Sequence, residues 1–339
     1  MGSMVSRTNR AIIQLLAIFL WFGFVISPAL HAGTLSPSII SMFPKDVGEL
    51  GYADLGHARN FPWFPQFQSQ LVPVSVLGFE QFIENAQVQH PPSIDQVVWA
   101  RISLSSRESG HLKPGSGQLV AVAAGQFDVE TIKSFLDSRN APTIQVGSEV
   151  VYSSQTDLGM SEGYFALLDN ETIAFGPLEG LKRILGIRAG DEGNLSQNAE
   201  MMASINKAST DAVFWGVLDS SGAEAAMQHL IPEAMKFPQA NELVKRLKEL
   251  LISVRASSNI EVEFQADSAS PNDAVVLSQL LEAGLLSKRY QSGQYDPELA
   301  KTLDSIQISP NGSHLDVFLH ISDDQMLMVI EHNAFSVAM

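Results

Sequence analysis

Two hydrophobic periods alternate along the chain. One is a period of two, typical of half-buried strands, and the other is a period of about 3.6, typical of amphipathic helices. The first pattern predicts strands at 47–55, 96–104, 118–124, 143–153, 163–175, 212–218, 259–266, 306–309 and 315–321. The second predicts helices at 62–71, 76–86, 222–230, 240–252, 271–290 and 325–333, and also directly after Asp128, Pro177 and Pro297. Strands interleaved with helices and hairpins indicate an α+β fold with antiparallel sheets covered by helices.

Turn and capping residues support these boundaries. Asp128 precedes an apolar helical face and is expected to cap it, as is Ser322 or Asp323 for the last helix. The pair Asp169-Asn170 favours a turn inside the segment 163–175. Asn311-Gly312 between two strand patterns is a strong hairpin signal.

The order strand, two helices, strand, helix, hairpin, helix occurs twice along the chain. We therefore expect two related halves, 33–205 and 206–339, each an antiparallel sheet covered by helices. The boundary is placed near 195–211, where Asn, Ser, Gln and Lys collect. At about 150 residues per domain, the length is also consistent with two domains.

The N-terminal segment 1–32 has the pattern of a secretory signal peptide. Arg7 and Arg10 precede an uncharged apolar run, and small residues follow the helix breaker Pro28. Cleavage is expected after Ala32 or, as a second choice, after Ala29. The alternative is an uncleaved anchor, because the apolar run approaches the ~20 residues that span a bilayer. The chain is thus expected to be exported to the periplasm or cell envelope, or anchored to the inner membrane by this segment.

Composition excludes several kinds of chemistry. The chain has 21 basic and 37 acidic residues, a formal net charge of −16, and residues 33–339 carry −18. Such a surface repels phosphate backbones, so nucleic acid is not an expected partner, and membrane contact is expected only through 1–32 if they persist. Cysteine is absent, which excludes disulfides, thiolate metal sites and a cysteine nucleophile.

Two segments resemble a group of exported bacterial proteins of unknown function. They are MFPKDVGELGYADL (42–55) and GYFALLDNETIAFGPLEGLKRIL (163–185). In that group a Pro-Lys-Asp opening leads into a first strand, and a later Gly-Tyr-x-Ala hairpin leads into a helix. The resemblance implies an exported bacterial protein and carries over no catalytic residue.

No motif supplies a catalytic or metal site. Ser161 lies in a G-x-S-x-G match, but a strand pattern follows it where a nucleophile elbow needs a helix. His314 and His320 share a strand face, yet they lie ~20 Å apart along the strand, too far for one metal ion. Asp323-Asp324 fits a helix cap better than an acid–base pair. The glycine-rich segment 113–117 lacks the P-loop ending. No metal or cofactor is expected.

The strongest surface-interaction candidates are four aromatic residues within seven positions: Phe61, Trp63, Phe64 and Phe67. Aromatic residues are enriched at interface centres, so these four could form a binding patch. The spacing of Phe64, Phe67 and Leu71 is helical, which favours core packing instead. Both interpretations stay open.

From the sequence we expect an exported, non-enzymatic binding or interaction module of the cell envelope. Its partner would be a protein or a small ligand, with a cleft between the halves as the default ligand site. One alternative is an envelope hydrolase that uses carboxylates or Ser161. Another is a membrane-tethered accessory protein.

Overall fold

A computed structural model describes residues 35–71, 94–102, 117–153, 163–209, 211–230, 238–257, 259–295 and 297–331, apart from a few side chains within them. Residues 33–339 form one compact unit, separate from 1–32. The predicted helix 76–86, residues 113–116 of the glycine-rich segment and Ser161 lie outside the described residues, as do residues 1–32. Among the helices that are described, none has the length and apolar character needed to cross a bilayer.

The described elements are of mixed type, which confirms the α+β class. The strands are β1 (Glu49–Asp54), β2 (Ile94–Ile102), β3 (Gln118–Gly125), β4 (Thr143–Val146), β5 (Glu149–Ser153), β6 (Tyr164–Leu167), β7 (Thr172–Gly176), β8 (Phe214–Asp219), β9 (Leu247–Ala256), β10 (Ile260–Ser268), β11 (Gln307–Asn311) and β12 (His314–Ile321). The helices are α2 (Pro37–Ile40), α3 (Leu55–Ala58), α4 (Phe64–Leu71), α6 (Val129–Ser138), α7 (Leu178–Ala189), the short 3₁₀ helix η1 (Leu195–Gln197), α8 (Ala199–Ala208), α9 (Ser220–Leu230), α10 (Pro238–Val244), α11 (Pro271–Tyr295), α12 (Pro297–Asp304) and α13 (Asp323–Glu331).

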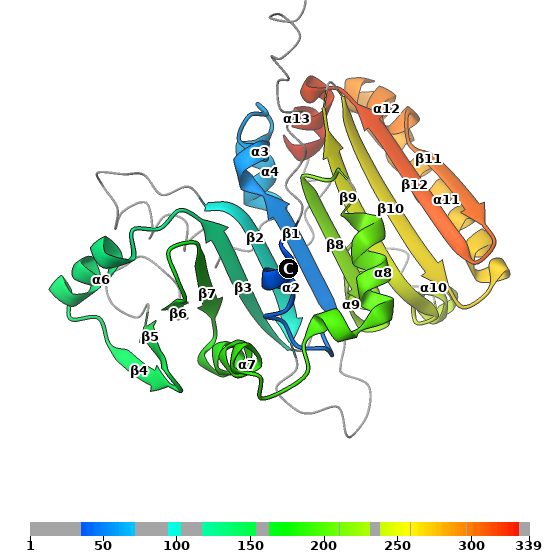
Figure 1. Cartoon of the computed structure of the whole chain (residues 1–339). Helices are drawn as coiled ribbons and strands as arrows, with labels where there is room; N and C mark the ends of the chain where they lie inside the picture. Colours follow the sequence, from blue (N-terminus) through cyan, green and yellow to red (C-terminus); the bar gives the residue numbers. More distant parts are fainter. Residues whose placement is uncertain are drawn as a thin grey trace, which may run out of the picture. The chain divides into compact units, whose positions relative to one another are not determined.

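All of these strands belong to one antiparallel sheet (Figure 1), in the order β11-β12-β10-β9-β8-β1-β2-β3-β7-β6-β5-β4. The expectation of a separate sheet for each half is therefore wrong. Strands from 33–205 and from 206–339 share one sheet because β1 pairs with β8 at its middle. Outward from that junction the order is β1, β2, β3, β7, β6 on one side and β8, β9, β10, β12, β11 on the other, and β5 and β4 extend the first side.

Two hydrophobic clusters lie on opposite faces of the sheet. Neighbouring residues of a strand point to opposite faces, and Leu251 belongs to one cluster while Leu250 belongs to the other. The larger cluster joins the strands near the junction to α2, α7 and α8. The second joins β9, β10 and β12 to α9, α10 and α11. In Figure 1, α8 lies in front of the sheet and α11 lies behind it.

The predicted helix at 240–252 is wrong in its second half. Helix α10 ends at Val244, and β9 begins at Leu247. Strand β9 is buried on both faces, so Leu250 and Leu251 are both apolar and the alternation that marks a half-buried strand is lost.

The polar segment 195–211 is folded, although its composition suggested a boundary. It contains η1 and α8, and Leu195, Met201 and Ile205 are buried in the larger cluster. The division of the chain at 205/206 stays a prediction.

The predicted caps and turns agree with the structure. Asp128 accepts a hydrogen bond from the Thr131 N–H at 3.0 Å. Ser322 and Gln325 form a reciprocal capping box, in which each side chain accepts from the other's N–H. Asn311-Gly312 joins β11 to β12, with Gly312 at a φ of 61°.

The two faces of the β1–β8 junction differ in the size of the side chains that they can hold. On one face Tyr52 stacks on Trp215, with ring centroids 5.4 Å apart, and burial together with the charge of Asp54 raises the pKa of the Tyr52 hydroxyl. On the other face Gly51 lies between Trp99 and Gly216 in the strand register. The Trp99 indole covers Gly51, and a Cβ at that position would overlap the ring.

We predict that Gly51→Ala lowers the free energy of unfolding by about 1–3 kcal/mol, the usual cost of overpacking a core. The buried indole of Trp99 has no room to move away from the new methyl group. The matched control is Gly216→Ala in the neighbouring strand, where an added Cβ would meet its nearest atoms at 3.9 Å. Urea unfolding of both variants measures the difference, and equal effects would contradict this account of Gly51.

Candidate functional site

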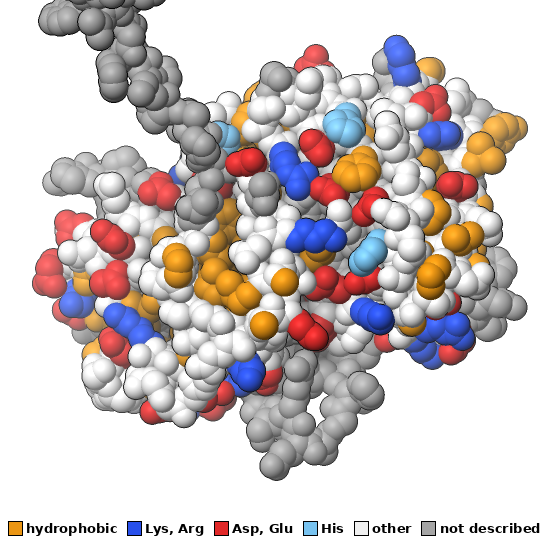
Figure 2. Space-filling view, turned by 45° about the vertical axis from the view of Figure 1, so that its right-hand side comes forward, with side chains coloured by type: hydrophobic (Ala, Val, Ile, Leu, Met, Phe, Trp, Pro, Cys, Tyr) orange, Lys and Arg blue, Asp and Glu red, His pale blue; other side chains and the backbone are white. Residues whose placement is uncertain are grey.

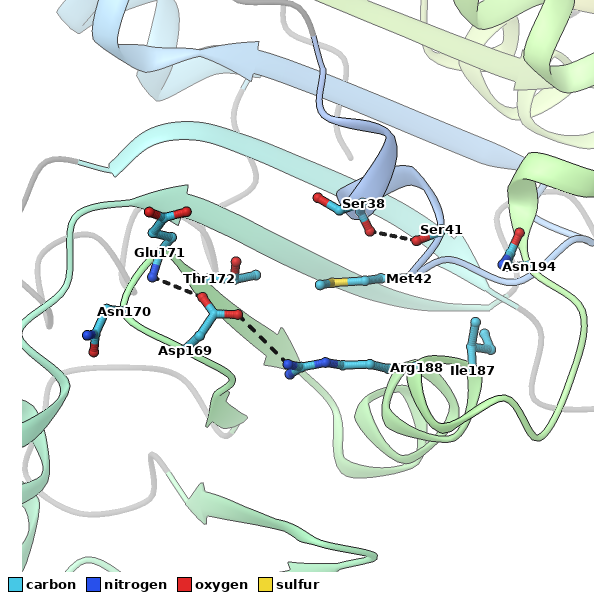
Figure 3. Close-up of a pocket in the computed structure, with 10 residues that line it drawn as sticks. All are labelled: Ser38, Ser41, Met42, Asp169, Asn170, Glu171, Thr172, Ile187, Arg188 and Asn194. Atoms are coloured by element: carbon cyan, nitrogen blue, oxygen red, sulfur yellow. Dashed lines mark hydrogen bonds and ion pairs between the residues drawn. The ribbon is translucent and has the colours of Figure 1, made fainter.

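An open cavity of about 700 Å³ lies beside α2 and the end of α7 (Figure 3). It is lined by side chains from four separate segments: Ser38, Ser41, Met42, Asp169, Asn170, Glu171, Thr172, Ile187, Arg188 and Asn194. Its volume is within the range of small-molecule sites. All of its lining residues come from 33–205, so this cavity is not a cleft between the two predicted halves.

The α2 wall is fixed by burial and by backbone hydrogen bonds. Ile39, Ile40 and Phe43 are buried in the larger hydrophobic cluster, so this short helix is held by packing. The Leu195 N–H donates to the Phe43 carbonyl at 2.8 Å, which ties the segment after α2 to the loop that carries Asn194. This bond directly joins two of the four lining segments.

An ion-pair network attaches the same wall to α7. The Arg183 guanidinium donates to Asp46 at 2.6 Å and to the two carboxylate oxygens of Glu192 at 2.9 and 3.0 Å. Burial by itself would lower the pKa of Arg183, but the hydrogen bonds and charges of Glu192 and Asp46 raise it overall. The network thus joins α7 to the chain on either side of it.

The opposite wall is the turn between β6 and β7. Asp169 accepts a hydrogen bond from the Glu171 N–H at 2.9 Å, and the Leu168 N–H donates to the Thr172 carbonyl at 3.0 Å. These bonds hold Asp169, Asn170 and Glu171 on an exposed turn at the rim. Helix α7 supplies the floor, with Ile187 buried and Arg188 directed toward Asp169 in Figure 3.

The lining combines hydrogen-bonding groups with one cation and two carboxylates. Hydroxyl and amide groups come from Ser38, Ser41, Thr172, Asn170 and Asn194, while Met42 and Ile187 supply apolar surface. Arg188 lies 3.8 Å from Asp169 and 4.0 Å from Glu149, so these ion pairs are longer than hydrogen bonds. This chemistry suits noncovalent binding of a small polar ligand.

The four predicted aromatic residues lie elsewhere, around α4. Trp63 and Phe64 have 0% and 4% of their surface exposed, and Phe61 stacks on Trp63 with ring centroids 5.4 Å apart. The Phe67 side chain is outside the described part of the chain. The three whose side chains are described do not line the cavity, and the role of the four as a binding patch stays a prediction.

A third group of polar side chains covers one face of β9, β10 and β12. Figure 2 shows acidic, basic and histidine side chains interspersed over this region. Across the strands, Arg255 pairs with Glu263 at 2.7 Å, and His314 Nδ1 lies 3.0 Å from Asp267. Within the described residues, no group of His, Asp and Glu side chains could hold a metal ion.

Glu249 lies in the same strand register as Asp267 and His314 and is the perturbed carboxyl of this face. Burial raises its pKa; a hydrogen bond from Ser204 and the charge of Lys207 lower it, and the charge of Asp267 adds to the rise. Its ionisation therefore opposes folding.

Sequence reasoning missed the cavity. One of its parts, the Asp169-Asn170 turn, was predicted from a local signal. The other lining residues have no local signature, because they are brought together only when α2 packs beside α7 and the 193–195 loop.

No protein-family model matches the chain, and no curated protein sequence matches it. Two solved structures, crystal forms I and IV of TP0453, are similar in part. The first is 11% identical, with a TM-score of 0.47, and the match covers 89% of this chain and 99% of TP0453. The second is 10% identical, with a TM-score of 0.46, and covers 88% and 97%. These similarities are too low to assign a function.

We predict that Arg183→Met lowers the free energy of unfolding by about 1–3 kcal/mol, because it leaves the partly buried carboxylate of Asp46, and the exposed one of Glu192, without their cation. The neighbouring Lys182→Met is the control, since Lys182 forms an exposed pair with Glu179 that contributes less than about 1 kcal/mol. Chemical denaturation of both variants distinguishes them. An equal loss in the two would mean that the network does not fix α7.

We predict that Glu249→Gln stabilises the protein at pH 7 and has little effect below pH 4. Below the ordinary carboxyl pKa of about 4.3, both the folded and the unfolded chain keep the proton. As pH rises toward the raised native pKa, the unfolded state loses its proton first and is favoured, so wild-type stability falls. The amide of the variant does not titrate and escapes this loss.

The measurement for Glu249→Gln is urea unfolding at a series of pH values. Glu130→Gln is the control, because the Glu130 side chain is 88% exposed. A variant that is less stable than the wild type at pH 7 would show that ionised Glu249 supports the fold.

Proposed function

We propose that this chain is an exported, non-enzymatic binding module of the cell envelope, and that the cavity beside α2 binds its small ligand. The observation that carries the proposal is the cavity itself. Its volume of about 700 Å³ is within the range of small-molecule sites, and its mostly polar lining offers hydrogen-bonding partners beside the apolar surface of Met42 and Ile187.

The fixed position of the walls supports a binding role. The α2 wall is held by core packing and the Arg183 network. The rim turn is held by the Asp169 side chain, which accepts from the Glu171 N–H, and by the backbone bond from Leu168 to Thr172. A site whose walls are already in place loses less conformational entropy when a ligand binds. Even a modest number of contacts is then sufficient for measurable affinity.

Export is supported by the signal pattern of residues 1–32 and by the resemblance to exported bacterial proteins. We propose that cleavage after Ala32 releases the folded unit into the periplasm or envelope. If residues 1–32 persist, the protein is instead an accessory module anchored to the inner membrane. N-terminal sequencing of the protein recovered from envelope fractions separates these two forms.

We also propose that the two halves are related by duplication. The support is the strand order outward from the β1–β8 junction, in which the last strand of each half pairs with the third. Strands β4 and β5 would then be an addition to the first half.

The test is equilibrium dialysis of the purified full-length protein against the small-molecule fraction of an envelope extract, read by mass spectrometry. We expect at least one compound to be enriched by the wild type and to be reduced at least tenfold with Arg188→Gln, which removes the cation of the cavity. Arg139→Gln is the control, because Arg139 is an exposed arginine that packs over the Phe135 ring.

Enrichment that Arg188→Gln leaves unchanged would place the ligand elsewhere on the molecule. The absence of any enriched compound would overturn the proposal of a small-molecule site. Thermal unfolding of both variants, expected to match the wild type, excludes loss of fold as the cause of lost binding.

A further inference from the structure

Among the residues that the structure describes, the neighbours of Arg188 leave part of its hydrogen-bonding capacity unused. The side chain is 35% exposed and extends from the last turn of α7 along the cavity floor. Asp169 and Glu149 approach it only to 3.8 and 4.0 Å, outside hydrogen-bond range. A guanidinium carries five N–H donors in a planar fork, which matches a carboxylate. A ligand acceptor in the cavity would find these donors free of close competition.

The rim of the cavity supplies hydrogen-bond acceptors, which complement the donors of Arg188. Asp169 uses one carboxylate oxygen for the Glu171 N–H and directs the other toward Arg188. Glu171 is exposed on the same turn and lines the same cavity. An ionised carboxylate can accept hydrogen bonds but cannot donate them, so this rim suits a cationic donor.

The balance of charge selects between ligand classes. A ligand with only negative charge would meet Arg188 but also Asp169, Glu171 and Glu149. A ligand with only positive charge would meet the carboxylates but would compete with Arg188 for them. A ligand that carries both charges pairs with each side, and it replaces the long Asp169–Arg188 contact with two shorter ones.

The geometry points to a small zwitterion, an amino acid or short peptide, as the ligand of this cavity; the inference rests on the binding role proposed above. The ligand carboxylate accepts hydrogen bonds from the Arg188 guanidinium. Its ammonium group donates to Asp169 and Glu171. The peptide groups of the ligand lie beside Ser38, Ser41 and Thr172, and an apolar side chain of the ligand contacts Met42 and Ile187.

The test uses the purified full-length protein and L-alanyl-L-alanine, titrated by isothermal calorimetry. Three matched forms of the dipeptide have an acetylated amine, an amidated carboxylate, or both. Glucose serves as a neutral polyol and inorganic phosphate as an anion. We expect the free dipeptide to bind and each single block to weaken binding at least tenfold.

Variants assign each charge to its partner. With Arg188→Gln, blocking the carboxylate should no longer matter. With the double variant Asp169→Asn, Glu171→Gln, blocking the amine should no longer matter. Asn at 169 can still accept from the Glu171 N–H, so the turn is kept. Arg139→Gln should leave every affinity unchanged.

The outcomes separate the ligand class from the binding role. If blocked and free dipeptides bind equally, or if only glucose or phosphate binds, the zwitterion inference is wrong and the cavity remains a binding site. If no dipeptide form binds while the dialysis experiment yields an Arg188-dependent compound, the inference again fails alone. If neither experiment yields a ligand, both proposals fail.

Discussion

Five residue pairs join β1 to β8, and through them the strands of both halves become one sheet. The junction has large side chains on one face and a glycine, which has no side chain, on the other. Tyr52 and Trp215 fill the first face by stacking, while Gly51 leaves space on the second for the Trp99 indole, which also contacts Phe214. Because β1 and β8 alternate strictly, a one-residue slip would exchange these faces and place the glycine under the stacked rings. The aromatic and glycine positions therefore define the register of the β1–β8 junction.

The cavity depends on the same core. Ile39, Ile40 and Phe43 of the α2 segment are members of the hydrophobic cluster that contains Tyr52 and Trp215. The helix that forms one wall is consequently positioned by the centre of the sheet. The other wall depends on the β6–β7 turn and on α7, which Arg183 ties to Asp46 just after α2. Arg188 faces the cavity, whereas Arg183 holds its walls together, so the two arginines of α7 have separate roles.

Local signals in the sequence were sufficient for most elements and insufficient for their assembly. Asp128, Ser322 and Asn311-Gly312 act on their immediate neighbours, so their roles as caps and turns could be predicted. Strand β9 could not, because burial of Leu250 and Leu251 on opposite faces removes the alternation on which the prediction depends. The single sheet was missed for a related reason, since nothing in β1 or β8 alone indicates its partner. The cavity is even harder to predict from the sequence, because it forms only between segments that the folded structure brings together.

The junction has a consequence for how the chain folds. Tyr52 and Trp215 are neighbours across the sheet but about 160 residues apart along the chain, a separation that slows folding through the entropy of closing so long a loop. Until β8 is in place, β1 is an open edge with unsatisfied backbone donors and acceptors, and the apolar ring of Tyr52 has no stacking partner. A chain that emerges from N- to C-terminus passes through this state for as long as its second half is incomplete. A fragment that ends before Phe214 would therefore keep this edge of β1 unpaired and would be prone to aggregate.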